Sequence, residues 1–269
     1  MAKKSRKNSN RDYDKRSHQD KRHNAHIEHV HGNVVHSMFD ESENGLSNWH
    51  PLDDDIDGQR DKKFVKNVRP RSEGQRTLME AIRERNLTLA IGPAGTGKTY
   101  LAIAAAVEAL EKGSIERIIL SRPAMEAGES LGYLPGDMHE KMAPYLRPLY
   151  DALGDRMGGK RVRQYMEDGT IEIAPVGFMR GRTLNNAFVV IDEAQNCTYG
   201  QLKMLLSRLG WHSKMVITGD PDQSDLLDGI SGLAEIARKL DTIENIAVVK
   251  LKQGDIVRHP LVAEMLDVL

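Results

Sequence analysis

Residues 92–99 read Gly-Pro-Ala-Gly-Thr-Gly-Lys-Thr, and residues 189–193 read Val-Val-Ile-Asp-Glu. The first stretch fits the pattern G-x-x-x-x-G-K-[ST] of a phosphate-binding loop. The second is an apolar run that ends in two carboxylates, which in proteins with such a loop handle magnesium and the attacking water. The apolar residues 87–92 predict a buried strand before the loop, and the Ala- and Leu-rich residues 99–112 predict a helix after it. Both stretches thus lie in the required context, and together they predict a nucleoside-triphosphate hydrolase.

The phosphate-binding loop defines the expected nucleotide site. Gly92, Gly95 and Gly97 allow the backbone to curl around phosphate oxygens with its N–H groups pointing inward. The N-terminus of the following helix adds a partial positive charge. We expect Lys98 to reach the β- and γ-phosphates and the Thr99 hydroxyl to ligate Mg²⁺. The predicted nucleotide-binding residues of this stretch are Gly92, Pro93, Ala94, Gly95, Thr96, Gly97, Lys98, Thr99 and Tyr100.

The carboxylates and two nearby amides are the expected chemical groups. Asp192 ends a predicted buried strand, where a charge is costly unless it pairs with a cation, so we expect it to hold Mg²⁺. Glu193 is the candidate base that polarises the attacking water. Gln195 follows closely, and Gln223 lies after the apolar residues 214–220. Either amide could bond the γ-phosphate or the water and sense hydrolysis, or could be a polar residue of a surface loop.

Gln75, upstream of the loop, has two interpretations. Its amide could read the edge of adenine. It could instead complete a helix capping box with Ser72, since Ser-x-x-Gln is that signature. No Asn-Lys-x-Asp tetrapeptide that would read guanine is present, so ATP is the expected nucleotide.

Composition bounds the other possibilities. The chain has 269 residues, 39% of them hydrophobic and 29% charged, and a net charge of −1, which by itself does not indicate a nucleic-acid binder. The single cysteine, Cys197, excludes a disulfide within the chain and suits a reducing compartment. No apolar stretch follows the basic N-terminus, and no run of about 18 apolar residues occurs, so we expect no secretory signal, no membrane span and a cytoplasmic location.

Residues 1–70 differ from the rest and are predicted to be a disordered tail, with a folded domain over residues 71–269. The tail holds 14 of the 38 Lys and Arg, 12 of the 39 Asp and Glu and 7 of the 10 His, and its apolar residues show no period. Its first 22 residues carry nine Lys or Arg against three Asp, a basic arm that could touch nucleic acid or only aid solubility. Its histidines lack accompanying cysteines, so we assign no metal to His23, His26, His29, His31 and His36.

Strands alternate with helices along the folded part. Expected strands are 87–92, 117–123, 170–176, 187–192, 214–220 and 246–251, and expected helices are 75–85, 99–112, 139–153, 201–209, 232–240 and 259–269. This order predicts an α/β fold with a mostly parallel sheet and helices on both faces.

Several motifs together resemble a known family. GPAGTGKT, DEAQN (192–196) and GDPDQ (219–223) are similar to the nucleotide motifs of superfamily-one helicases. The segments 121–153, 177–184 (GFMRGRTL) and 255–262 (DIVRHPLV) resemble the PhoH family of cytoplasmic ATPases, and the resemblance runs from about residue 72 to the C-terminus. It implies a single RecA-like domain that binds and hydrolyses ATP, with links to phosphate starvation and RNA metabolism. The tail shows no sign of the nuclease domain that some such proteins carry.

A single domain leaves the far side of the γ-phosphate open. About 195 residues follow Gln75, enough for one RecA-like domain, whereas helicases of that superfamily use two. An arginine from a neighbouring subunit could fill this place, which predicts a homo-oligomeric ring, for example a hexamer. The first candidate for this catalytic arginine is Arg258; the alternatives are Arg122, Arg180 and Arg182, and each could instead form a surface salt bridge.

The function remains open between two classes. In the first, the chain is an ATPase, such as an RNA helicase, that remodels RNA or other single-stranded nucleic acid. Tyr, Met and basic residues of 124–150 could contact the strand or pack against a subunit. In the alternative, it is an ATP-gated switch or adaptor without unwinding. A small-molecule kinase is disfavoured, because Glu193 is placed to activate water and no acceptor site is legible.

Overall fold

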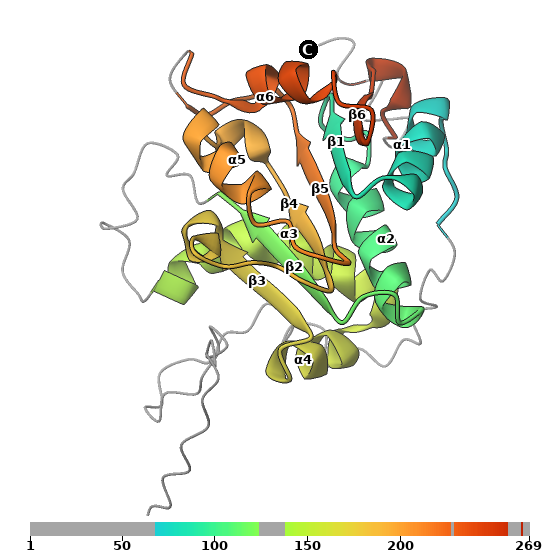
Figure 1. The fold of residues 1–269 in the computed structure, drawn as a ribbon. Helices are drawn as coiled ribbons and strands as arrows, with labels where there is room; N and C mark the ends of the chain where they lie inside the picture. Colours follow the sequence, from blue (N-terminus) through green and yellow to red (C-terminus); the bar gives the residue numbers. More distant parts are fainter. Residues whose placement is uncertain (1–67, 124–137, 227–228, 258–264, 266–269) are drawn as a thin grey trace, which may run out of the picture. The chain divides into compact units, whose positions relative to one another are not determined.

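The computed structural model describes residues 68–123, 138–226, 229–257 and 265. Figure 1 shows the elements along this part of the chain. The helices are α1 (Glu73–Glu84), α2 (Lys98–Glu111), α3 (Met138–Met157), α4 (Gly159–Glu167), α5 (Tyr199–Leu206) and α6 (Leu233–Leu240). The strands are β1 (Leu87–Ile91), β2 (Arg117–Arg122), β3 (Ile171–Pro175), β4 (Ala187–Ile191), β5 (Lys214–Gly219) and β6 (Ile246–Lys250). Short 3-10 helices are η2 (Val176–Met179), η3 (Ala194–Asn196) and η4 (Gln253–Asp255).

The strands form one six-stranded sheet in the order β3-β2-β4-β5-β1-β6, and neighbouring strands in it are parallel. The strand before the phosphate-binding loop, β1, therefore does not touch β4, the strand before the carboxylates, because β5 lies between them. All strands point the same way, so the loops that follow them meet at one edge of the sheet. We call this the carboxyl edge and the opposite one the amino edge. The α/β, RecA-like fold expected from the sequence is confirmed.

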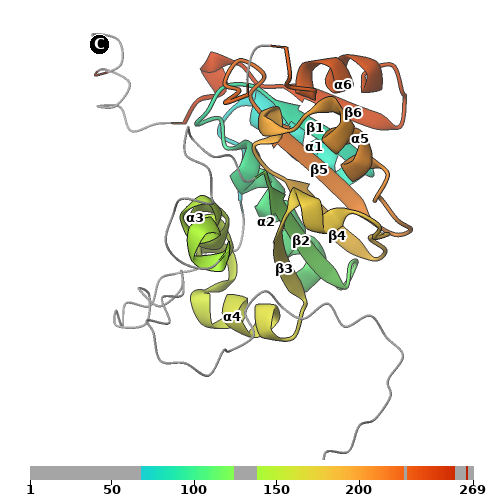
Figure 2. The same ribbon diagram turned by 90° about the vertical axis from the view of Figure 1, so that its left-hand side faces the viewer.

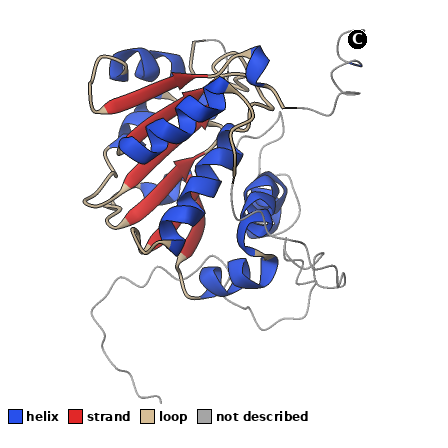
Figure 3. Ribbon diagram, turned by 90° about the vertical axis from the view of Figure 1, so that its right-hand side faces the viewer, coloured by secondary structure: helices blue, strands red, loops and turns tan. Residues whose placement is uncertain are grey.

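Helices cover both faces of the sheet (Figures 2 and 3). On one face, α1 to α4 pack on strand residues such as Ala90, Leu120 and Val190. On the other, α5, α6 and η2 pack on the alternate strand residues, such as Leu89 and Val189. Both β1 and β4 are buried along their whole length, which explains why their sequences are apolar without alternation.

Helix ends follow local side-chain chemistry. Ser72 caps α1 by accepting a hydrogen bond from the N–H of Gln75, at 3.2 Å. Thr198 and Gln201 form a full capping box at the start of α5. The start of α2 has no side-chain cap, because its N-cap is Gly97. The first N–H groups of α2 are therefore left for another partner.

Most sequence-predicted elements are found within two or three residues of their expected bounds, and α3 extends beyond both ends of the expected 139–153. Helix α4 was not predicted. Its sequence starts at Gly158-Gly159, and only Val162 and Met166 are buried, too few apolar residues to show a helical period. The tail, the segment 124–137 and nearly all of the expected last helix at 259–269 lie outside the described residues.

Candidate nucleoside-triphosphate site

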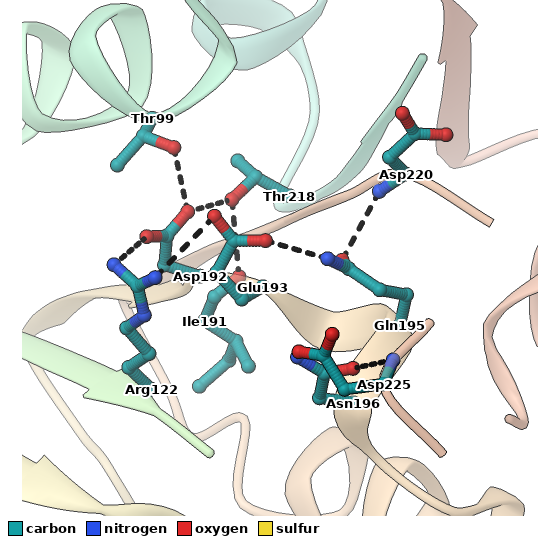
Figure 4. A network of polar contacts seen from close by, with 10 residues as sticks. All are labelled: Thr99, Arg122, Ile191, Asp192, Glu193, Gln195, Asn196, Thr218, Asp220 and Asp225. Carbon is teal, nitrogen blue, oxygen red and sulfur yellow. Dashed lines mark hydrogen bonds and ion pairs between the residues drawn. The ribbon is translucent and has the colours of Figure 1, made fainter. Parts of the chain in front are cut away.

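Three loops and the end of one strand bring polar groups together at the carboxyl edge. The phosphate-binding loop follows β1, Arg122 ends β2, Asp192 and Glu193 follow β4, and Asp220 follows β5. Figure 4 shows Thr99, Arg122, Thr218 and Gln195 around the carboxylates of Asp192 and Glu193.

The phosphate-binding loop adopts a conformation that requires glycine. Gly92 has φ of 144°, and a Cβ there would lie 2.4 Å from the carbonyl oxygen of Leu251. Gly95 and Gly97 both have φ of 82°, in the left-handed region that side chains disfavour. The loop leads directly into the uncapped start of α2. A helix start of this kind, after a glycine-rich turn, fits a phosphate group.

Lys98 lies inside the loop rather than in solvent. Its Nζ donates hydrogen bonds to the carbonyl oxygens of Gly92 and, at 2.8 Å, Pro93. Burial lowers the pKa of this ammonium, although Asp220, Glu193 and Asp192 act in the opposite direction. Three carboxylates thus act electrostatically on the Lys98 side chain.

Asp192 is the centre of a hydroxyl–carboxylate cluster. Its Oδ1 accepts hydrogen bonds from Thr99 Oγ1 at 2.5 Å and from Thr218 Oγ1 at 2.7 Å (Figure 4). The side chain is buried, with 3% of the residue exposed. The two residues predicted to hold Mg²⁺, Thr99 and Asp192, are thus in direct contact. Thr218, at the end of β5, was missed; its place just before Gly219-Asp220, at a strand end, was the available signal.

Glu193 is held from both sides. Its Oε2 accepts a hydrogen bond from Gln195 Nε2 at 2.5 Å, and its Oε1 lies 3.6 Å from Arg122 Nη2. Gln195 in turn accepts at Oε1 from the N–H of Asp220, at 3.1 Å. The backbone of Glu193 has φ of 52°, a left-handed conformation that costs a non-glycine residue about 1–2 kcal/mol. Strain of this kind concentrates at functional sites.

The loops after β4 and β5 are joined by further side-chain bonds. Asn196 and Asp225 exchange two, from Asn196 Nδ2 to Asp225 Oδ2 at 2.8 Å and from the Asp225 N–H to Asn196 Oδ1 at 2.9 Å. Ser224 Oγ donates to the carbonyl of Gln195 at 3.1 Å. These bonds hold the loops after β4 and β5, which carry Asp192, Glu193 and Asp220, in a fixed arrangement.

Gln75 contacts the phosphate-binding loop through its amide. Its Nε2 donates to the carbonyl of Thr96 at 3.0 Å, and its Oε1 accepts from the N–H of Arg71 at 2.9 Å. The capping-box interpretation is therefore wrong in its second half, because the side chain does not return to Ser72. The amide points instead to the phosphate-binding loop, beside the candidate site.

The remaining predicted residues are less closely engaged. Gln223 is exposed, and only its backbone N–H is bonded to the loop, at the carbonyl of Asp220. Tyr100 packs partly against the core. Of the arginines, Arg182 is committed to Glu172 by two bonds of 2.5 and 2.6 Å, and Arg180 is exposed. Arg258 lies outside the described residues; the residue before it, Val257, donates its N–H to the carbonyl of Gly95 at 3.0 Å.

The groups present suit magnesium held mainly by phosphates. In the described ranges no cluster of three or more His, Cys, Asp or Glu could hold a metal alone. Mg²⁺ is commonly bound through one or two carboxylates together with substrate phosphates, and Thr99 with Asp192 provides such a partial set. Among the same residues, none of the helices is both long and apolar enough to cross a bilayer.

Three features define a phosphate-binding-loop domain of the α/β class. They are the parallel sheet, the glycine-rich loop before the uncapped α2, and the contact between the Thr99 hydroxyl and the Asp192 carboxylate. Comparison with known proteins refines this class. The chain belongs to the PhoH family: the family model for PhoH-like proteins matches residues 67–269.

Relatives agree with this assignment. A PhoH-like protein of Bacillus subtilis (strain 168) is 56% identical over 203 residues, which are 75% of this chain and 64% of that protein. Protein PhoH of Escherichia coli (strain K12) is 42% identical over 205 residues, 75% of this chain and 58% of that one. The chain thus spans about three-fifths of the length of the curated relatives it matches. Among solved structures, the large terminase of a thermophilic bacteriophage has a TM-score of 0.48 at 13% identity, over 74% of this chain and 50% of that one.

Proposed function

We propose that this chain binds ATP with Mg²⁺ at the carboxyl edge and hydrolyses it. The single observation that carries the proposal is the contact between Thr99 and Asp192, 93 positions apart in the sequence, beside the uncapped start of α2. A phosphate-binding loop without the carboxylate could serve binding alone. The carboxylate pair beside it adds groups suited to hydrolysis.

The residues divide the work as follows. The N–H groups of the loop and the start of α2 bind phosphate oxygens, and Lys98 exchanges its bonds to loop carbonyls for bonds to the β- and γ-phosphates. Thr99 and Asp192 hold Mg²⁺, which supplies charge neutralisation on the phosphates when bound. Glu193, oriented by Gln195, accepts a proton from the attacking water.

Three further roles belong to the same proposal. Gln195 and Gln223 sense the γ-phosphate, and the bond from Gln195 to the N–H of Asp220 offers a path to the loop after β5. Gln75 reads adenine, for which it must exchange its present bonds to Thr96 and Arg71. Arg258 acts on the site of a neighbouring subunit in a ring.

We further propose that hydrolysis is coupled to remodelling of RNA or another single-stranded nucleic acid. The support is membership of the PhoH family, for which the resemblance noted in the sequence implies a link to RNA metabolism. The competing function is an ATP-gated switch without unwinding. The hydrogen-bonded loops after β4 and β5 would suit a switch equally, since they can transmit a change at the nucleotide to a partner.

The test is steady-state ATP hydrolysis with and without single-stranded RNA, with Lys98→Ala as the blank. Turnover above the blank supports the ATPase, and turnover equal to the blank overturns it. Stimulation by RNA supports remodelling and leads to unwinding assays. Turnover that ignores both RNA and DNA supports the switch and leads to a search for a protein partner captured only with ATP.

A further inference from the structure

Among the candidates for the catalytic arginine that lie in the described residues, Arg122 alone contacts the carboxylates, and these belong to its own chain. Its Nη1 lies 3.6 Å from Asp192 Oδ2, and its Nη2 lies 3.6 Å from Glu193 Oε1 (Figure 4). The side chain is 21% exposed. The guanidinium thus spans both carboxylates and turns inward rather than out toward a neighbour.

The strand order produces this contact. Strand β2 lies beside β4 in parallel register, with Ser121 opposite Ile191. Arg122 therefore ends its strand level with the position where Asp192 follows β4. The N–H of Asp192 is also bonded to the carbonyl of Ser121, at 2.8 Å. The cation is held in place by the sheet and not by a flexible loop.

Charge explains why a cation is needed here. Asp192 and Glu193 are adjacent in sequence, so two negative charges lie close together, and the Asp192 carboxylate is buried away from water. Within the described part of the chain, Arg122 forms the ion pairs of both carboxylates. Lys98, the other cation nearby, donates to carbonyls of the phosphate-binding loop instead.

The two oxygens of Glu193 have different partners. Oε2 is bonded to the neutral amide of Gln195, whereas Oε1 faces the Arg122 guanidinium. Asp192 is divided in the same way, with Oδ1 on two hydroxyls and Oδ2 toward Arg122. Removing the guanidinium would release one oxygen of each carboxylate while leaving the other in place. The expected damage is a loss of orientation and not a loss of folding.

We propose that Arg122 is a positioning residue that acts in cis: it fixes the Glu193 and Asp192 carboxylates of its own chain in the geometry needed for hydrolysis. The proposal rests on the proposed function, because it takes Glu193 as the base. It separates Arg122 from Arg258, which the proposed function assigns to a neighbouring subunit.

The first experiment compares wild type, Arg122→Ala and Arg122→Lys. We expect Arg122→Ala to lower kcat about a hundredfold, as misplacement by about 1 Å can do, while the Kd for a fluorescent ATP analogue stays within about threefold. Lysine keeps the positive charge but lacks the forked guanidinium that reaches two carboxylates. The kcat of Arg122→Lys should therefore lie between those of wild type and Arg122→Ala. The control is Arg117→Ala, which removes an arginine from the opposite end of the same strand and should retain the wild-type kcat.

The outcomes distinguish the two proposals. If wild type turns over no faster than Lys98→Ala, the proposed function fails. If wild type turns over and Arg122→Ala matches it, only the role of Arg122 fails. A parallel loss of kcat, nucleotide binding and melting temperature in Arg122→Ala would make the residue merely structural and would also overturn the proposal.

The second experiment tests whether the action is in cis. Arg122→Ala and Lys98→Ala chains are mixed in equal amounts and allowed to exchange subunits. An arginine that served the neighbouring site would restore turnover, since intact Arg122 and intact Lys98 would meet across subunits. Our proposal predicts no recovery, and recovery overturns it. The same mixture with Arg258→Ala in place of Arg122→Ala is the comparison, in which the proposed trans arginine should give recovery.

Discussion

Lys98 and Lys214 are two shielded lysines at opposite edges of the same sheet. Lys98 donates to the carbonyls of Gly92 and Pro93, and Lys214 donates to those of Ile82, Arg83 and Arg85 at 2.8–2.9 Å. Burial lowers the pKa of both ammonium groups. Only Lys98 has three carboxylates acting against that effect. Their local bonding is alike, so it does not reveal which lysine is functional.

The surroundings make the difference. At the amino edge, Lys214 uses its three donors on carbonyls around the end of α1, which a helix leaves without partners. At the carboxyl edge, Lys98 bonds two carbonyls of a glycine-rich loop and faces Asp192, Glu193 and Asp220. Polar groups at the amino edge complete the backbone of the fold. In the proposed function, those at the carboxyl edge bind the phosphates of ATP and Mg²⁺.

The largest expected effect tests the carboxyl edge. Lys98→Ala should lower ATP turnover at least about a hundredfold, because a preformed donor to the transferred phosphate is lost. The melting temperature should change by no more than about 2 °C, since the lysine bonds only the loop. Turnover is measured by phosphate release and folding by circular dichroism. Turnover of Lys98→Ala equal to that of wild type would show that Lys98, like Lys214, has no part in catalysis.

The reciprocal change tests the amino edge. Lys214→Ala removes charged donors from three carbonyls, each pair contributing on the order of 1 kcal/mol, and should destabilise the domain by about 2–3 kcal/mol. For a domain of this size the melting temperature should fall by about 5–10 °C. Turnover per folded molecule should stay unchanged. Lys203→Ala, which removes an exposed lysine from α5, is the matched control. A drop in turnover without a drop in stability would contradict the comparison.

A smaller effect is expected at Gln75, which joins α1 to the phosphate-binding loop. Gln75→Ala should weaken ATP binding about fivefold, the worth of roughly one hydrogen bond of about 1 kcal/mol. If the Gln75 amide reads adenine, Gln75→Ala should also show a smaller preference for ATP over GTP than wild type. Equal weakening of ATP and GTP, measured by competition, would leave Gln75 as a tether of the loop.

The last prediction needs no substitution and concerns Cys197, in the segment that follows the two carboxylates. Cys197 is fully buried, and burial raises the pKa of its thiol to about 12. At pH 8 the native protein should react with Ellman's reagent about a thousandfold more slowly than the denatured chain, because the thiolate is the reacting form. The chain has one cysteine, so the readout is unambiguous. Rapid reaction of the native protein would mean that the segment after the carboxylates opens readily.

The sequence predicted the parts of the site that lie in contiguous motifs. The phosphate-binding loop and the Asp192-Glu193 pair are each recognisable from neighbouring residues. Thr99 and Asp192 were each expected to hold Mg²⁺, and the structure brings the two side chains into contact. Recognising each motif depends on local chemistry alone.

The sequence could not predict contacts that depend on strand order. Thr218 reaches Asp192 because β5 lies between β1 and β4, although it comes later in the chain than either. Arg122 was considered as an arginine for a neighbouring subunit, yet it lies on the carboxylates of its own chain because β2 is next to β4. The sequence gives no sign that Lys214 caps the end of α1, because the carbonyls that it bonds are 129 to 132 positions away. Chain order does not determine which strands are neighbours.

One measurement tests the central claim most directly: single-turnover hydrolysis of ATP by wild type and by Glu193→Gln, with nucleotide binding followed in the same samples. The substitution preserves the shape of the side chain and removes its ability to accept a proton. We expect Glu193→Gln to bind ATP as wild type does and to hydrolyse it about 10²–10⁴-fold more slowly. Equal rates for the two proteins, at equal binding, would show that the carboxyl edge does not perform the chemistry proposed for it.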